Sequence, residues 1–415
     1  MEPEDVPLFL ANAEDMIRRY RNHPSIALWF GRNEGVPQPV LNEGLERLVR
    51  ALDGTRWYTG SSNSVNLWFS GPYNYREPAS YFTEHGKGFA VEIGAPSFPT
   101  LEAFEAAIPP SERWPISDSW AYHDWHQNGN GETKSFVAAM TAKYNAPTSL
   151  ADFERKAQLM NYDDYRAIME GMNAELWSKT SGRMLWMTQS AWPSTMWQII
   201  SHDYDTHAAF YAFKHAAEPV HVQLTLPDHR VQLIDNRQTP IAGARVTARV
   251  LALDGRELAT RTATIDVAAG QVADAARLDL APILAGQGAV IVALDAAAAD
   301  GTALSHNLYW LARDDAAARA LDAMPPQRVS AHARREGDHV TVDLVNSGTA
   351  PALNVKLTLL DRAGARVLPA YYDDNYVSLL PGERRAIAIR YDRGSPARVA
   401  LRGWNAVPTR AEIGR

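Results

Sequence analysis

The chain has 415 residues, of which 46% are hydrophobic and 21% charged, with a formal net charge of -7 and no cysteine. This length predicts two or three domains, and the composition is that of a globular protein. The charge gives no basic footprint for nucleic acid, and no apolar run approaches the ~20 residues that span a bilayer. We therefore expect no nucleic-acid and no membrane partner. Disulfides and thiolate metal sites are excluded by the missing cysteines.

The N-terminal segment predicts a helix and a strand. MEPEDVPLFL lacks the basic region and the apolar run of a signal peptide. ANAEDMIRRYRNHP then predicts a helix that ends before Pro24, and the strand SIALWFG follows at once. This order indicates a chain that begins in the middle of an α/β domain.

Up to about residue 217, short apolar strands alternate with helical stretches. The candidate strands are IALWFG, RWYTGS, FAVEIG and RMLWMTQ, with a further one near LWFSGPY. The helical patterns are LNEGLERLVRAL, TLEAFEAAI, TSLADFERKAQLM and DDYRAIMEGMNAELW. Such alternation is typical of a parallel sheet with crossover helices.

From Glu218 onward the pattern has a period of two. Segments of this kind, ended by Asp-Gly, Ser-Gly or Ala-Gly turns, are HVQLTL, ARVTARVLALDG, HVTVDLVNSG and NVKLTLLDRAG. They predict the antiparallel strands of two small sandwiches, with a linker near Ala323 to Pro326. The expected domains are therefore residues 1–217, 218–322 and 323–415.

Two glutamates follow apolar strands at glycine-containing turns. Glu34 comes after SIALWFGRN, and Glu92 lies in FAVEIG. The simplest alternative for Glu34 is a helix-capping acid in a loop. In a parallel barrel, however, the C-terminal ends of the strands share one face, where two such acids would meet. A retaining glycosidase needs one carboxylic acid to protonate the leaving oxygen and a carboxylate ~5–5.5 Å away to attack the anomeric carbon.

Several segments resemble glycoside hydrolase family 2. RNHPSIALWFGRNEG resembles the acid/base segment on the fourth barrel strand of that family, and FAVEIG resembles its nucleophile segment on the seventh. MLWMTQSAWPSTMWQIISHDYDTHAAFYAFKHAAEPVHVQ is similar to the eighth strand and the final helix. RVLPAYYDDNYVSLLPGE and the closing GWN resemble the last domain of the exo-β-D-glucosaminidase and glycoprotein β-mannosidase branch.

This resemblance implies a fold and an activity. The fold is a partial (β/α)8 TIM barrel, strands four to eight, followed by two immunoglobulin-like β-sandwich domains. The activity is hydrolysis of β-mannosides or β-glucosaminides without a cofactor, with Glu34 as acid/base, Glu92 as nucleophile and Asn33 bonded to the substituent on sugar carbon 2. Once Glu92 is negative, a nearby Glu34 is expected to stay protonated at neutral pH.

Four aromatic residues beside the predicted strand ends are candidates for sugar contact. Trp186, at the end of the last strand, could form a platform for the CH face of a pyranose, with a barrel-core tryptophan as the alternative. Tyr73 and Tyr75 in GPYNY would lie by the sixth strand end, where a tyrosine could hydrogen-bond the nucleophile. Trp192 in QSAWPS would line the rim, with simple packing as the alternative.

The segment SWAYHDWHQNGNGE, residues 119–132, has two interpretations. His123 and His126 with Asp124 between them suggest a metal site, but the spacing is weak and no third ligand lies nearby. The aromatic residues and the NGNG run instead favour a loop beside the cleft, and such loops shape substrate subsites. We predict substrate contact through Trp125 and no metal.

Family members carry a sugar-binding-like β-sandwich, an immunoglobulin-like domain and three barrel strands before the part seen here. We therefore expect a fragment, or a separately encoded part, whose partner is the missing N-terminal part of the same enzyme. An incomplete barrel has an open edge, so the isolated chain is expected to be nearly inactive. Bacterial relatives of this kind are commonly exported, which implies a periplasmic or secreted full-length form.

Two classes of function stay open at this point. The first is a retaining β-glycosidase that acts on an oligosaccharide or glycan. The second is a non-catalytic glycan-binding or assembly fragment that needs its N-terminal part.

Overall fold

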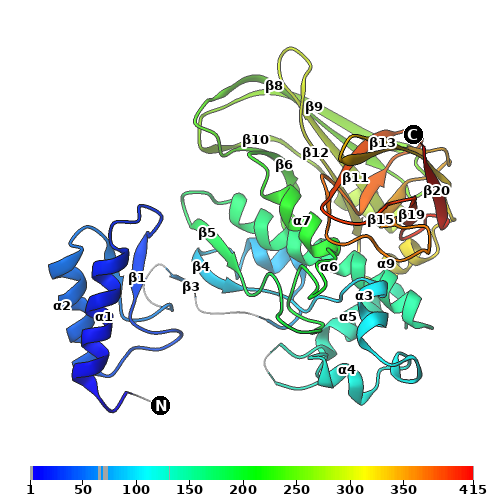
Figure 1. Cartoon of the computed structure of the whole chain (residues 1–415). Coiled ribbons are helices and arrows are strands. Elements are labelled where there is room, and N and C mark those ends of the chain that lie inside the picture. The colour runs from blue at the N-terminus through cyan, green and yellow to red at the C-terminus, as the bar shows by residue number, and fades with distance from the viewer. Residues whose placement is uncertain (1–2, 64–66, 69–72, 130, 415) are drawn as a thin grey trace. The chain divides into compact units, whose positions relative to one another are not determined.

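The computed structural model describes residues 3–63, 67–68, 73–129 and 131–414 (Figure 1). The chain divides into two units. The first unit comprises residues 1–71, 87–93 and 179–185, and the second unit comprises residues 72–86, 94–178 and 186–415. None of the helices in the described ranges is long and apolar enough to cross a membrane.

The first unit contains helices and short parallel strands. They are α1 (Val6–Tyr20), β1 (Leu28–Phe30), α2 (Pro39–Leu52), β2 (Trp57–Thr59), β3 (Leu67–Trp68), β4 (Gly88–Ile93) and β5 (Thr180–Leu185). β1 pairs with β2, and β4 lies between β3 and β5, each pair being parallel. The predicted parallel strands are confirmed, and the closure of these two sheets into part of a TIM barrel stays a prediction. Of the predicted strand near LWFSGPY, residues 69–72 lie outside the described residues.

Helix α1 begins five residues earlier than the sequence pattern predicts. The side chain of Asp5 accepts a hydrogen bond of 2.9 Å from the backbone N–H of Leu8, and Pro7 occupies the first turn. A capping acid and an early proline both stabilise a helix N-terminus, because the first N–H groups have no partner inside the helix. The start of α1 is therefore set by its cap rather than by its apolar stripe.

The second unit begins with helical structure. Its helices are α3 (Leu101–Ala107), α4 (Asp118–Tyr122), α5 (Lys134–Tyr144), α6 (Leu150–Asn173) and α7 (Ala208–Ala216), with short 3-10 turns at Pro78–Phe82 and Pro110–Glu112. α6 has 24 residues and is buried along most of its length, packed against α7, α5 and the first 3-10 turn. Figure 1 shows α6 and α7 side by side in green.

The sequence predicts two helical segments where α6 is one continuous helix. Between the two predicted segments lies Asn161, a residue with low helix propensity. Its buried side chain accepts a hydrogen bond of 3.2 Å from the N–H of Phe98 and donates one of 2.9 Å to the Phe98 carbonyl. These tertiary contacts outweigh the local propensity, so the helix continues.

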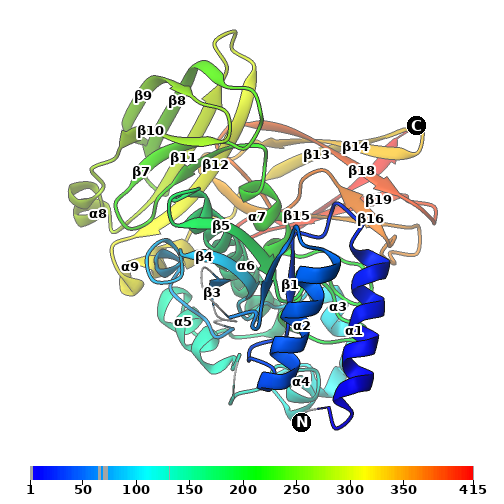
Figure 2. The same ribbon diagram turned by 90° about the vertical axis from the view of Figure 1, so that its left-hand side faces the viewer.

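The β region that follows α7 begins with antiparallel sheets. Its first strands are β6 (Val220–Leu224), β7 (Arg230–Asp235), β8 (Ile241–Leu251), β9 (Glu257–Val267), β10 (Gln271–Arg277), β11 (Ala289–Ala297) and β12 (Ala303–Ala312), with α8 (Ala281–Gln287) between β10 and β11. They form a sheet of order β10-β7-β6 and a sheet of order β12-β11-β8-β9, with one apolar core. Figure 2 shows both sheets in green and yellow. We call this region the middle sandwich.

Helix α9 (Asp315–Asp322) leads into the last β region. Its strands are β13 (Val329–Glu336), β14 (His339–Asn346), β15 (Ala352–Leu360), β16 (Ala370–Tyr372), β17 (Val377–Leu379), β18 (Arg384–Tyr391), β19 (Arg398–Arg402) and β20 (Thr409–Gly414). They form one curled sheet of order β16-β18-β14-β13-β20-β19-β15-β17 around a core of their own. The predicted period-two strands are thus confirmed, and the strands of the two regions fall within residues 218–322 and 323–415. The domain boundaries themselves stay a prediction.

Gly171 and Gly286 predict opposite responses to alanine, although both lie in helices. A Cβ at Gly171 of α6 would lie 2.1 Å from the backbone oxygen of Tyr81, whereas a Cβ at Gly286 of α8 would meet nothing within 4 Å. Gly171→Ala should therefore lower the free energy of unfolding by about 1–3 kcal/mol through overpacking. Gly286→Ala should raise it by about 0.5–1 kcal/mol, because alanine is the better helix former. Chemical unfolding of both variants measures this, and equal stability would contradict the tight helix contact.

His215 predicts a loss of stability at alkaline pH. This side chain of α7 lies 3.1 Å from Glu218 and 2.7 Å from Asp374, with Arg385 3.6 Å from Asp374 and the ring of His306 packed beside it. Burial disfavours the charged imidazole, but Asp374 and Glu218 outweigh it and raise the pKa of His215 to about 10. The stabilisation is therefore full below pH ~6.5, the unfolded pKa, and is lost as the pH rises toward 10.

The test of this prediction compares pH profiles of stability. His215→Gln should be less stable than the parent by on the order of 2 kcal/mol at pH 6.5, because the buried Asp374 loses its nearer cation and keeps only Arg385. The difference should narrow as the pH is raised to 10. Parallel profiles of unfolding free energy for the two proteins would show that His215 is not charged in the folded chain.

Candidate active site

Glu34 lies in the turn that follows β1, and this turn is hydrogen-bonded to the turn that follows β2. β1 ends at Phe30, which pairs with Thr59 of β2. The N–H of Glu34 donates to the hydroxyl oxygen of Ser62 at 2.8 Å, and the N–H of Ser62 donates to the carbonyl of Arg32 at 3.1 Å. The turn after one strand is thus fixed by the turn after its parallel neighbour. Both Asn33 and Glu34 are exposed to solvent there.

The backbone of Glu34 is in the left-handed region, with φ 55°. Non-glycine residues avoid this region because Cβ crowds the backbone, at a cost of about 1–2 kcal/mol. Strained residues persist where their surroundings over-determine them, and they are frequent at functional sites. The hydrogen bond from Glu34 to Ser62 is one such contact, and the Nδ2 group of Asn63 donates to the Glu34 carbonyl at 3.4 Å.

Glu92 is the penultimate residue of β4, the central strand of its sheet. Val91 and Ile93 on either side of it are buried, whereas Glu92 itself is half-buried. Ile93 is in register with Leu185 of β5. Glu92 therefore occupies the carboxyl end of a strand that is fixed on both edges, as the sequence predicts.

The end of β4 passes close to the end of β5. A Cβ at Gly94 would lie 2.3 Å from the carbonyl oxygen of Trp186, so only glycine fits at position 94. Trp186 follows β5 directly, and 44% of its side chain is exposed. The glycine of FAVEIG is thus explained by a close backbone approach, and Trp186 has an open ring rather than the core position of the alternative interpretation.

The two glutamates lie on different sheets in the described ranges. Glu34 follows β1 of the two-stranded sheet, and Glu92 lies in β4 of the three-stranded sheet. Each occupies the strand-end position that the sequence predicts. Their separation of ~5–5.5 Å, which a retaining mechanism needs, stays a prediction.

Three of the predicted sugar-contacting aromatics pack inside the second unit. Tyr73 is buried with its ring 5.1 Å from that of Trp197, and Tyr75 packs edge-on against Phe136. Trp125 is fully buried in a cluster of aromatic rings formed by Phe98, Trp120, Phe136 and Phe153. A fully buried ring presents no face to a sugar, so Trp125 belongs to the core and not to the predicted sugar contacts.

Two other aromatic residues, Tyr122 and Trp192, have exposed rings. Trp192 is 40% exposed and stacks on the His123 ring with centroids 5.3 Å apart, while Tyr122, 74% exposed, meets Trp192 edge-on at 5.8 Å. The His123 carbonyl accepts hydrogen bonds from the N–H and the hydroxyl of Thr195, at 2.9 and 2.7 Å. We call Tyr122, His123 and Trp192 the aromatic platform. The sequence indicated Trp192 but not Tyr122, although the run SWAYHDW contains both Tyr122 and the buried Trp125.

The histidines of this loop make contacts within the protein. The Nδ1 group of His123 donates to the Pro193 carbonyl, and that of His126 to the Asn128 carbonyl at 2.9 Å. Across the part of the chain that the structure describes, no three His, Asp or Glu side chains are grouped so as to hold a metal ion.

Comparison with known proteins shows which enzymes this chain is similar to. A family model described as the exo-β-D-glucosaminidase Ig-fold domain matches residues 307–406, which include the second half of β12 and the strands β13 to β19 of the last sheet. The relatives of the chain are exo-β-D-glucosaminidases and β-mannosidases of glycoside hydrolase family 2. The resemblance inferred from the sequence is confirmed.

Individual relatives match nearly the whole chain. The exo-β-D-glucosaminidase of Streptomyces avermitilis is 29% identical over 97% of this chain and 50% of its own length, and the mannosylglycoprotein endo-β-mannosidase of Lilium longiflorum is 28% identical over 97% and 54%. The crystal structure of the Amycolatopsis orientalis exo-chitosanase is 26% identical with a TM-score of 0.86, covering 98% of this chain and 54% of that one. A complex of that enzyme holds PNP-β-D-glucosamine. The chain spans about half the length of the curated relatives it matches.

The geometry of the Glu34 turn predicts how two substitutions affect stability. Glu34→Gly should keep or raise the free energy of unfolding, by up to about 1 kcal/mol, because glycine adopts a positive φ without strain. Ser62→Ala should lower it by about 1 kcal/mol, because the N–H of Glu34 loses its acceptor. Chemical unfolding measures both. A Glu34→Gly variant less stable than Ser62→Ala would contradict a strained glutamate.

Proposed function

We propose that this chain is the C-terminal part of a retaining β-glycosidase that cleaves β-mannosides or β-glucosaminides, with Glu34 as acid/base and Glu92 as nucleophile. One observation carries the proposal: a chain related over 97% of its length to such enzymes holds two glutamates at the carboxyl ends of parallel strands. Support for Glu34 also comes from its strained, neighbour-held backbone.

The proposed reaction has two displacements. In the first, a carboxylate oxygen of Glu92 attacks the anomeric carbon while the bond to the leaving oxygen breaks and Glu34 gives that oxygen its proton. In the second, Glu34 takes a proton from water, and the water oxygen displaces Glu92 from the anomeric carbon. The acid and the base are therefore the same side chain, which changes role between the steps.

The surroundings of the two glutamates have proposed roles in binding. Asn33 precedes Glu34 in the same exposed turn, and its amide would bond the substituent on sugar carbon 2. Trp186 follows β5, the neighbour of the strand that carries Glu92, and its exposed ring would receive a sugar face. For Tyr73 and Tyr75, which pack against Trp197 and Phe136, we propose no stacking on sugar.

Substitution of the glutamates predicts an effect that depends on the leaving group. Glu34→Gln should lower turnover of an alkyl β-glycoside by about 10²–10⁴-fold, because the alkoxide needs a proton as it leaves. The same variant should cleave a dinitrophenyl β-glycoside nearly as well in the first step, since that leaving group needs none. Glu92→Gln should abolish turnover of both substrates. The measurement is kcat/KM of the parent and of each variant with each of the two substrates.

A matched control separates this chemistry from a general charge effect. Glu43 is exposed on α2 and belongs to the same unit, so Glu43→Gln should leave both activities unchanged. The assays use the 415-residue chain and, in parallel, an extended chain. The extension corresponds to the half of the relatives that the 415 residues do not match. We expect far lower turnover in the 415-residue chain. An extended chain that prefers an aryl β-galactoside to the β-mannoside and β-glucosaminide would overturn the proposed specificity.

The aromatic platform supports a second candidate, glycan binding without catalysis. Trp192→Ala and Tyr122→Ala should each weaken binding of a β-linked mannose or glucosamine disaccharide several-fold, since stacked rings give such ligands much of their contact. Tyr371→Ala is the matched control, because Tyr371 is similarly exposed, at 44%, in the last sheet. Titration followed by tryptophan fluorescence or calorimetry measures this. Binding that persists in both platform variants would remove this candidate.

A further inference from the structure

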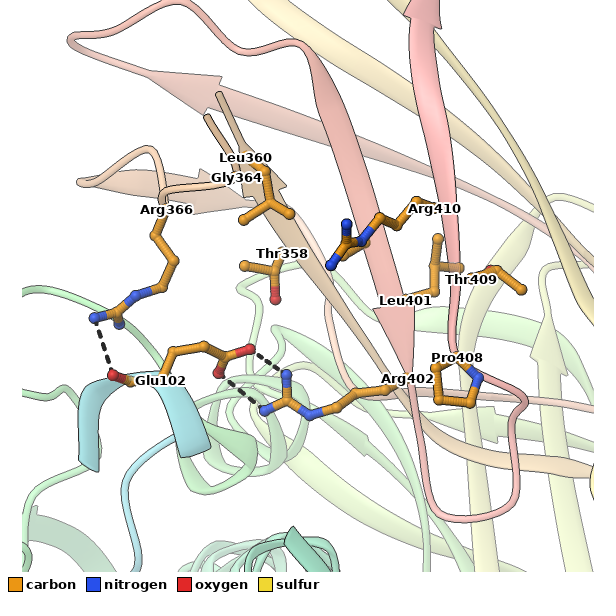
Figure 3. Close-up of a pocket in the computed structure, with 11 residues that line it drawn as sticks. Glu102, Thr358, Leu360, Gly364, Arg366, Leu401, Arg402, Pro408, Thr409 and Arg410 are labelled. Atoms are coloured by element: carbon orange, nitrogen blue, oxygen red, sulfur yellow. Dashed lines mark hydrogen bonds and ion pairs between the residues drawn. The ribbon is translucent and has the colours of Figure 1, made fainter. Parts of the chain in front are cut away.

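A cavity of about 600 Å³ lies in the second unit, between α3 and strands β15, β19 and β20 of the last sheet (Figure 3). This volume is in the range of small-molecule sites. One wall comes from Glu102 of α3, and the opposite wall comes from residues about 250–300 positions later in the chain. Neither Glu34 nor Glu92, which belong to the first unit, lines the cavity.

The floor of the cavity is one row of residues across three strands. Thr358 of β15 pairs with Ala400 of β19, which pairs in turn with Arg410 of β20. Residues directly opposite one another in a sheet point to the same face. Because Ala400 is small, the row leaves a hollow between the Thr358 hydroxyl and the Arg410 guanidinium. Leu360 and Pro408 add apolar surface.

The neighbouring cation on the same face is held by carboxylates. Arg402 contacts both oxygens of Glu102 and lies 3.0 Å from Glu154. Lys356, opposite Arg402 in the register, lies 2.9 Å from Glu102. Both oxygens of Glu102 therefore have cationic donors, and the carboxylate that lines the cavity is already neutralised.

Arg366 is likewise occupied. It lies 2.9 Å from Asp205 and 2.7 Å from Asp203, and it donates to the backbone carbonyl of Glu102 at 3.4 Å. These contacts fix the guanidinium at the edge of the cavity (Figure 3). Charge-assisted pairs of this kind are geometrically specific, so the wall is built before any ligand arrives.

Arg410 differs from the other two arginines. Its side chain extends from β20 into the cavity toward Thr358 (Figure 3). Within the described ranges, no carboxylate or other acceptor pairs with this guanidinium. Three arginines thus line the cavity against one neutralised carboxylate, and Arg410 is the one whose donors are available to a ligand.

We propose that this cavity binds a small sugar derivative that carries one anionic group, a carboxylate or a phosphate. The anionic group would accept two parallel hydrogen bonds from Arg410, which presents a planar fork of donors. Hydroxyl groups of the ligand would bond Thr358, and its CH surface would lie on Leu360 and Pro408. The site is independent of the proposed glycosidase activity.

The test measures binding to the 415-residue chain by calorimetry or ligand-observed NMR, with glucuronate, glucose 6-phosphate and glucose as probes. At least one of the charged sugars should bind at least about tenfold more tightly than glucose, and added salt should weaken it. Binding of only glucuronate, or of only glucose 6-phosphate, supports the proposal and identifies the anionic group.

Three variants locate the site. Arg410→Gln should weaken binding of the charged sugar by about tenfold or more. Arg384→Gln should leave it unchanged, because Arg384 is exposed on β18 and does not line the cavity. Ala400→Leu should block the hollow without changing any charge.

Several results would overturn the proposal. The first is that glucose binds as tightly as the charged sugars. The second is that neither charged sugar binds with a Kd below about 10 mM. The third is that binding is unchanged in both Arg410→Gln and Ala400→Leu.

Discussion

Pairing of buried charge on α6 holds the second unit together. An ionised group inside a protein is costly unless it is paired, and removing one partner strands the other. Glu170 lies 2.9 Å from His221 and accepts hydrogen bonds of 2.7 and 2.8 Å from Asn307 and Tyr309, all in the middle sandwich. Glu154, four turns earlier, pairs with Arg402 of the last sheet. One helix thus contacts both β regions through buried acids, because Glu170 bonds the middle sandwich and Glu154 pairs with the last sheet.

The sequence predicted which helices and strands form better than it predicted the residues at which they begin and end. Strand ends and period-two strands follow from local patterns, so β1, β2, β4 and the sandwich strands could be predicted. The continuity of α6 could not, because the bonds of Asn161 come from Phe98, far along the chain. The start of α1 depended on one capping side chain, Asp5, which an apolar pattern does not register.

The candidate site was predictable to different degrees for acids and aromatics. A glutamate at the end of an apolar strand has few structural alternatives, so Glu34 and Glu92 could be placed from the sequence. An aromatic residue in a loop has two structural alternatives, a buried core position or an exposed platform. Which one it takes depends on residues far away in the sequence. Trp125 and Tyr122 are three residues apart, yet Trp125 is enclosed by Phe98, Phe136 and Phe153 while Tyr122 remains outside.

The acids of α6 make contacts that stabilise the fold, whereas Glu34 has a backbone conformation that costs stability. Glycine would adopt φ 55° at this position without strain. Gly35 stands one residue too late to do so, and a glutamate occupies the strained position instead. The hydrogen bond to Ser62 is worth about 1 kcal/mol, which offsets much of the strain. A strained glutamate that is held by a neighbouring strand end supports the proposed acid/base role of Glu34.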